Sequence, residues 1–74
     1  MADFAVILVH STSHAISAER VLRRAGLNPK LVPTPRHLSS DCGMAVRISA
    51  EDQTAGRQAL EIAGVPFDRL ETLD

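Results

Sequence analysis

The chain has 74 residues, of which 45% are apolar, 23% are charged and 3% are aromatic, and its formal net charge is -1. A chain of this length buries only about 60% of the surface that its unfolded form exposes, so we expect one domain over residues 1–74, without a deep enclosed cavity. The near-zero charge, the scarcity of aromatic side chains and the absence of a long apolar run argue against nucleic acid and membranes as partners, and predict a cytoplasmic protein.

The first half of the chain predicts a strand, a helix and a second, short strand. Residues 4–9 form an uninterrupted apolar run that is typical of a strand buried on both faces. Apolar side chains then recur at helical spacing from about residue 14 to residue 25, after a hydroxyl cap, and Gly26 ends this helix. Residues 30–32 predict a second strand, which the prolines that follow it place at an edge of the sheet.

The second half predicts a strand, a helix and a last strand after an irregular stretch over residues 34–43. Residues 44–49 alternate between apolar and polar side chains, as a strand with one buried face does. Ser49 and Asp52 resemble a capping arrangement for a second helix that Gly64 ends. The apolar face of this helix is predicted to contain Ala55, Ala59, Ile62 and Ala63. Residues 65–73 predict a strand at the other edge of the sheet.

The resulting order, βαββαβ, predicts an α+β domain of the ferredoxin-like sandwich type. Right-handed crossovers give a four-stranded antiparallel sheet in the order 4-1-3-2, with both helices on one face. The uncovered face is apolar at its centre, whether it carries Ala5, Ile7 and Val9 or Phe4, Val6 and Leu8. An exposed apolar face of this kind predicts a homodimer through the open side of the sheet.

Cys42 is the strongest candidate functional residue, and as the single cysteine it has no partner for an internal disulfide. The predicted topology brings residues 10–14, 34–43 and 64–66 to one end of the sheet, near the start of the first helix. Backbone N–H groups and the helix dipole stabilise a thiolate at such a position. Many lone cysteines are buried hydrophobes, but the turn-forming neighbours of Cys42 favour an accessible thiol.

Two other chemistries are weaker interpretations of the same residues. A zinc set would consist of His10, His14, His37 and Cys42, but this spacing is not diagnostic, and no paired-cysteine motif supports it, so no metal is expected. Hydrolysis by a Cys-His pair needs an orienting residue and a substrate cleft, for which a chain of this size has little room. The three arginines of the first helix, at positions 20, 23 and 24, are interpreted as a solvated face.

Residues 33–43, Pro-Thr-Pro-Arg-His-Leu-Ser-Ser-Asp-Cys-Gly, resemble the signature of the selenium/sulfur-carrier-like domain family. Residues 10–12, His-Ser-Thr, before a helix that contains Ala18-Glu19, are similar to the first strand-helix junction of that family, so the resemblance covers nearly the whole chain. It implies a cysteine that carries a chalcogen atom as a persulfide or selenosulfide in bacterial sulfur or selenium metabolism. It singles out Cys42 as the carrier, supported by Gly43, Arg36 and Ser39 of the same loop.

Ser11, Thr12 and His14, at the start of the first helix, complete the set of supporting residues that we expect near the thiol. The expected function is that of a carrier without a cofactor, not of a turnover enzyme: Cys42 accepts sulfur or selenium from a donor protein and passes it to an acceptor protein. The alternative is a non-catalytic ligand-sensing or oligomerisation module in which the cysteine is incidental. The predicted fold does not discriminate between the two, because such sandwiches host many unrelated functions.

Overall fold

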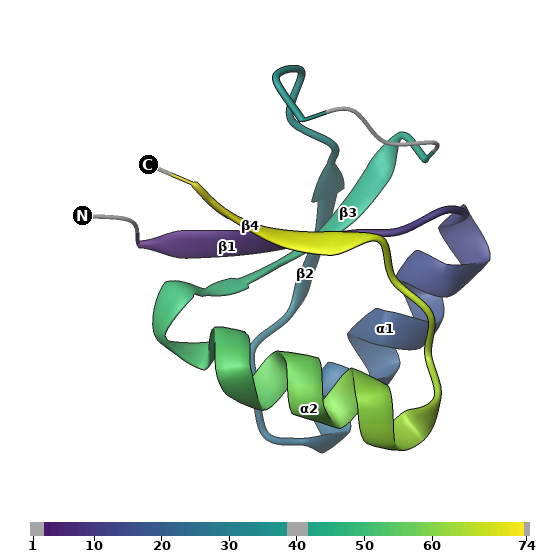
Figure 1. Cartoon of the computed structure of the whole chain (residues 1–74), viewed down its shortest axis with the longest axis vertical. Helices are drawn as coiled ribbons and strands as arrows, with labels where there is room; N and C mark the ends of the chain where they lie inside the picture. Colours follow the sequence, from purple (N-terminus) through teal and green to yellow (C-terminus); the bar gives the residue numbers. More distant parts are fainter. Residues whose placement is uncertain (1–2, 39–41, 74) are drawn as a thin grey trace.

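A four-stranded antiparallel sheet with two α-helices on one face makes up the structure, a computed structural model that describes residues 3–38 and 42–73 (Figure 1). In chain order, the elements are β1 (Phe4–Leu8), α1 (Thr12–Arg24), β2 (Lys30–Pro33), β3 (Met44–Ser49), the 3-10 turn η1 (Ala50–Asp52), α2 (Gln53–Ala63) and β4 (Arg69–Leu73). The Cα extents of 28 × 28 × 16 Å fit one sheet covered by a single layer of helices. The α+β class predicted from the sequence is therefore confirmed.

The sheet has β1 and β3 at its centre and β2 and β4 at its edges. The strands lie in the order β2-β3-β1-β4, which is 4-1-3-2 when read from the β4 edge. In the middle of the sheet, Ile7 of β1 lies between Val46 of β3 and Leu70 of β4. The uninterrupted apolar sequence of β1 suits this central place, because both faces of the strand are buried from Ala5 to Leu8. Pro33 is tolerated because β2 is an edge strand.

Two apolar clusters lie on opposite faces of the sheet. The cluster on the helix side contains Ala5, Ile7, Val9, Ala15, Ala18, Leu22, Cys42, Val46, Ile48 and Leu60. The cluster on the other face contains Val6, Leu8 and Ala45, with Val32, Leu38 and Leu73 packed against it. Alternating side chains of β1 thus supply both clusters, as expected for a strand at the centre of a sheet.

The open face is apolar at its centre, as predicted, but the prediction that this centre is uncovered is wrong. Val6, Leu8 and Ala45 lie on that face but have 0% relative exposure. Leu38, from the loop after β2, and apolar side chains of the edge strands pack over them. At one end of the face Phe4 is 41% exposed, and the Arg47 guanidinium lies 4.3 Å from its ring centroid.

Both helices have ends that the sequence largely predicts. Thr12 begins α1 two residues earlier than expected, because Ser11 is the N-cap and its Oγ accepts a hydrogen bond from the His14 backbone N–H at 3.3 Å. Gly26, just after α1, and Gly64, at the end of α2, have φ values of 87° and 73°, in the left-handed region where glycine is unstrained. Within the described part of the chain, neither helix combines the length and apolar character needed to cross a bilayer.

The second helix differs from the prediction at its start and on its buried face. Neither Ser49 nor Asp52 makes a side-chain capping hydrogen bond, and η1 precedes α2, so the predicted capping arrangement is wrong. The helix packs through Gly56, whereas Ile62, predicted in the core, is 88% exposed. A Cβ at position 56 would lie 3.0 Å from Ile48 Cδ1, so the missing side chain permits the close approach of α2 to the sheet.

Candidate functional site

Cys42 lies two residues before β3, next to the first turn of α1. Its Sγ atom is 3.6 Å from Oγ1 of Thr12, the first residue of α1. The same sulfur accepts a hydrogen bond from the backbone N–H of Met44 at 3.4 Å. The structure therefore brings the thiol to the N-terminal end of α1, as the topology predicts.

The side chain of Cys42 is buried, with a relative exposure of 6%. It belongs to the helix-side cluster, so the expectation of an accessible thiol is wrong. The physical reason is the alternation of side chains along β3 and its approach: residue 42 shares its parity with Val46 and Ile48, which face the helices. The turn-forming neighbours of Cys42 predict a loop, but they do not predict the direction in which the Cys42 side chain points.

The backbone at Cys42 is held by Thr34 across the base of the loop. Thr34 Oγ1 donates a hydrogen bond to the carbonyl oxygen of Cys42 at 2.8 Å, and Thr34 N–H donates one to the carbonyl oxygen of Gly43 at 2.9 Å. These bonds extend the pairing of β2 and β3 beyond its last pair, Pro33 with Met44. Gly43 is exposed and does not have a positive φ, so a left-handed backbone is not the reason for glycine at this position.

The other supporting residues are placed as follows. Ser11 caps α1, and its Oγ also lies 3.0 Å from Ser13 Oγ. His14 is in the first turn of α1, where its Nδ1 atom is buried and has no hydrogen-bond partner. Arg36 is exposed on the turn over residues 35–38, and the described contacts do not connect it with the thiol. Ser39 lies outside the described residues.

Two contributors to this site are not apparent from the sequence pattern alone. One is the Met44 N–H, because Met44 is recognised only as a strand residue; a backbone N–H two residues after a short polar side chain is nevertheless a common hydrogen-bond donor to it. The other is Thr34, whose contact with the Cys42 carbonyl depends on the pairing of β2 with β3. Of the residues predicted to support the thiol, Thr12 is the one that the described contacts place against the sulfur.

The residues considered for a zinc set are all described, and they do not gather. Over residues 3–38 and 42–73, no three His, Cys, Asp or Glu side chains are placed to hold one metal ion. The interpretation of His10, His14, His37 and Cys42 as metal ligands is therefore set aside.

A family model described as "Putative Se/S carrier protein-like" matches residues 4–70, from the first residue of β1 into β4. The chain belongs to this family. The match confirms the resemblance of the proline- and cysteine-containing segment and includes all the residues singled out at the thiol. Searches of curated proteins and of solved structures gave no match to the chain.

In this chain of the Se/S carrier-like family, the thiol has a defined chemical environment. The Met44 N–H points at the sulfur, and the Thr12 hydroxyl can donate to it or accept from it. Both groups are hydrogen-bond partners of the sulfur, which an apolar side chain at this position would leave unused. The surrounding apolar cluster keeps bulk water away from the same atom.

Proposed function

We propose that this chain carries a sulfane sulfur or selenium atom on Cys42 and passes it from a donor protein to an acceptor protein. The observation that carries the proposal is the position of the sulfur. In a chain of the Se/S carrier-like family, Cys42 Sγ lies between the Thr12 hydroxyl and the Met44 N–H at the start of α1. The family description supports sulfur or selenium as the cargo, and cytoplasmic bacterial metabolism of these elements is the setting that we propose for it.

The transfer balances without an external oxidant or reductant. A donor persulfide, R–S–SH, meets the Cys42 thiol, which attacks the outer sulfur as a thiolate. The S–S bond of the donor breaks, the donor leaves as R–SH, and Cys42 becomes Cys42–S–SH. A selenosulfide donor, R–S–SeH, gives Cys42–S–SeH in the same way, and the reverse exchange with an acceptor thiol regenerates Cys42.

Burial of the thiol is compatible with storage of such a group. Exposed thiolates oxidise readily to sulfenic and sulfinic acids, and an apolar surrounding slows access of the oxidant. Cys42 has a relative exposure of only 6%, so transfer also requires a local opening that exposes the sulfur. The hydrogen bonds from Thr34 hold the chain closed at that point.

The same burial favours a second candidate, a non-catalytic ligand-sensing or oligomerisation module. In this case Cys42 is a small apolar residue of the core, which is a common role for a lone cysteine. A homodimer through the open face of the sheet would belong to this candidate. Its support is limited to the rim of that face, where Phe4 is 41% exposed, because the centre is buried.

Loading with glutathione persulfide, followed by mass spectrometry of the intact protein without reductant, separates the two candidates. A carrier gains the mass of one sulfur atom, and a peptide map places that mass on Cys42. Cys42→Ser is the control: its hydroxyl can still accept from the Met44 N–H, so the variant should fold and gain nothing. Equal mass gain in Cys42→Ser, or no gain in the folded wild type while the urea-unfolded chain is loaded, refutes the carrier and supports the module.

A further inference from the structure

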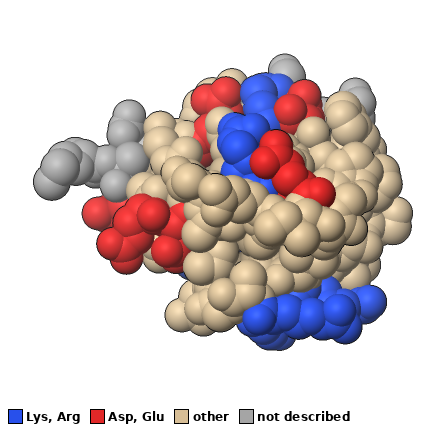
Figure 2. All heavy atoms as spheres, turned by 60° about the horizontal axis from the view of Figure 1, so that its bottom comes forward, with Lys and Arg blue, Asp and Glu red and all other residues tan. Residues whose placement is uncertain are grey.

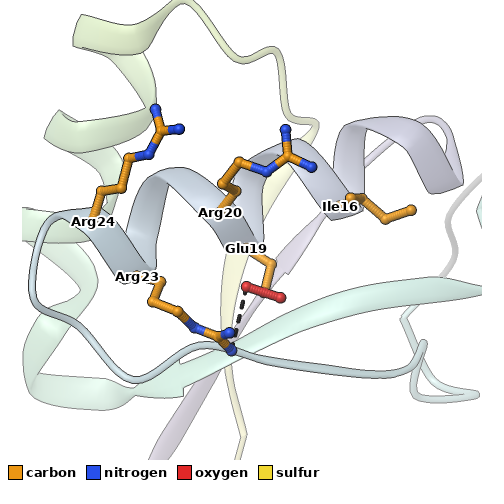
Figure 3. A pocket seen from close by; sticks show the side chains of 5 residues that line it. All are labelled: Ile16, Glu19, Arg20, Arg23 and Arg24. Atoms are coloured by element: carbon orange, nitrogen blue, oxygen red, sulfur yellow. Dashed lines mark ion pairs between the residues drawn. The ribbon is translucent and has the colours of Figure 1, made fainter.

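The outer face of α1 carries exposed arginines beside an exposed isoleucine. Arg20, Arg23 and Arg24 are all exposed, and Ile16 is 45% exposed. Together with Glu19 these side chains line an open hollow of about 510 Å³ (Figure 3). An isoleucine left exposed among arginines has no role in the core described above.

The charge of this face is only partly compensated. An Arg23 guanidinium nitrogen lies 3.3 Å from a carboxylate oxygen of Glu19, whereas Arg20 and Arg24 form no ion pair with any residue over 3–38 and 42–73. Arg20 and Arg24 extend to the same side of the helix, one turn apart (Figure 3). Three arginines and one glutamate thus make the face positive in a chain of net charge -1. Figure 2 shows one group of Lys and Arg along an edge of the molecule, apart from the acidic groups, and a second group that lies among acidic side chains.

Stabilisation of the helix explains part of this pattern. Basic side chains in the last turn, Arg23 and Arg24, interact favourably with the helix dipole. That effect falls off within one turn, so it does not explain Arg20, and it gives no reason for the exposed Ile16. The combination of unpaired positive charge with an apolar side chain is typical of a protein-binding surface.

We propose that Ile16, Arg20, Arg23 and Arg24, the α1 basic face, bind an acidic surface on a partner protein. The partner offers carboxylates spaced by one helical turn, which pair with Arg20 and Arg24, and an apolar side chain that packs on Ile16. This proposal rests on the proposed function, because the acidic protein is then the donor or the acceptor of the sulfur atom. A single isoleucine without aromatic neighbours suits neither a membrane surface nor a nucleic acid that needs stacking.

The position of the α1 basic face relative to the thiol supports this assignment. An α-helix rises 1.5 Å per residue, so Ile16 lies about 6 Å and Arg24 about 18 Å along the axis from Thr12. The Thr12 side chain contacts Cys42 Sγ. A protein bound on this face therefore has one edge beside the thiol end of α1 without covering it. Its own cysteine can react with Cys42 there once the local opening exposes the sulfur.

The test is an NMR titration of the ¹⁵N-labelled chain with a synthetic helical peptide. On one face of its helix the peptide carries a leucine, to pack on Ile16, and a glutamate at each of the next two turns, to pair with Arg20 and Arg24. We expect amide shift changes concentrated in residues 16–24 at low salt. Arg20→Glu and Arg24→Glu should each weaken binding by about fivefold or more, because each replaces an attraction by a repulsion. Lys30→Glu, an exposed charge reversal on β2, is the matched control and should leave the affinity unchanged.

Several results would overturn the proposal. The first is that the amide shift changes lie outside α1, or that none occur at millimolar peptide. The second is that a peptide with glutamine at the glutamate positions binds with the same affinity. The third is that Arg20→Glu and Lys30→Glu change the affinity equally. Tighter binding of the same face to vesicles of phosphatidylglycerol, to RNA or to a second copy of the chain would also overturn it. Two measurements keep the proposals separate. Arg20→Glu should take up persulfide like the wild type, and Cys42→Ser should bind the peptide like the wild type. Failure of one proposal therefore leaves the other intact.

Discussion

Replacement of Thr34 by valine tests whether local opening before β3 controls access to Cys42. The hydroxyl of Thr34 donates to the Cys42 carbonyl oxygen at 2.8 Å, and its backbone N–H donates to the Gly43 carbonyl oxygen at 2.9 Å. Valine keeps the backbone bond and nearly the same side-chain shape. The substitution therefore removes one hydrogen bond from the closed state and little packing.

The expected size of the effect follows from this single bond. A hydrogen bond of this kind contributes about 0.5–1.5 kcal/mol to the closed state, after exchange with water is counted. Because Cys42 is only 6% exposed, alkylation requires the open state. If the opening free energy falls by that amount, the open population and the alkylation rate rise by about 2- to 13-fold.

The assay is the rate of iodoacetamide alkylation of the native protein at fixed pH, followed by intact mass, with the urea-unfolded chain as the reference for intrinsic reactivity. Thr54→Val, at an exposed position of α2, is the matched control and should react like the wild type. Equal rates for Thr34→Val and wild type would refute the reasoning. A rate gain fully explained by the loss of global stability, measured by urea denaturation, would refute it as well.

Three further predictions concern the site and the two helices. Thr12→Val should shorten the lifetime of a persulfide on Cys42, whereas Thr12→Ser, which keeps the hydroxyl, should preserve it. The lifetime is measured by intact mass against time, and equal lifetimes in the two variants contradict a role for the hydroxyl. Gly56→Leu should lower the free energy of unfolding by about 1–3 kcal/mol through overpacking, while Ala55→Leu, exposed on the same helix, should change it by less than about 0.5 kcal/mol. Ser11→Ala should cost about 1 kcal/mol for the lost cap, and an unchanged urea midpoint would contradict that role.

Elements with a strong local pattern could be predicted from the sequence. The apolar run of β1 and the alternation of β3 predict strands within one residue of their observed bounds. Gly26 and Gly64 mark the helix ends because few other residues adopt a left-handed φ without strain. The buried face of α2 could not be predicted, since it is decided by the approach of Gly56 to Ile48, two residues that are close only in the folded chain.

The candidate site was predictable in place but not in exposure. The topology alone brings Cys42 to the start of α1, and its contact with Thr12 agrees with that. Its burial follows from the alternation of side chains that continues backwards from Val46 to residue 42. The turn-forming residues before Cys42 instead predict an exposed thiol. The Thr34 contact depends on the register of β2 against β3, which short edge strands do not specify strongly from sequence.

If Cys42 carries a persulfide as proposed, the packing around it gives the empty and the loaded chain different shapes. A persulfide extends the side chain by one S–S bond, about 2.05 Å, plus the size of a sulfur atom. Interiors packed to the density of organic crystals have no spare volume for such a group, so the outer atom displaces neighbours of the helix-side cluster or turns out past Thr12. The bound sulfur or selenium atom would thereby alter the conformation and the thermal stability of the chain. An acceptor protein would then distinguish the loaded chain from the empty one before any bond is exchanged.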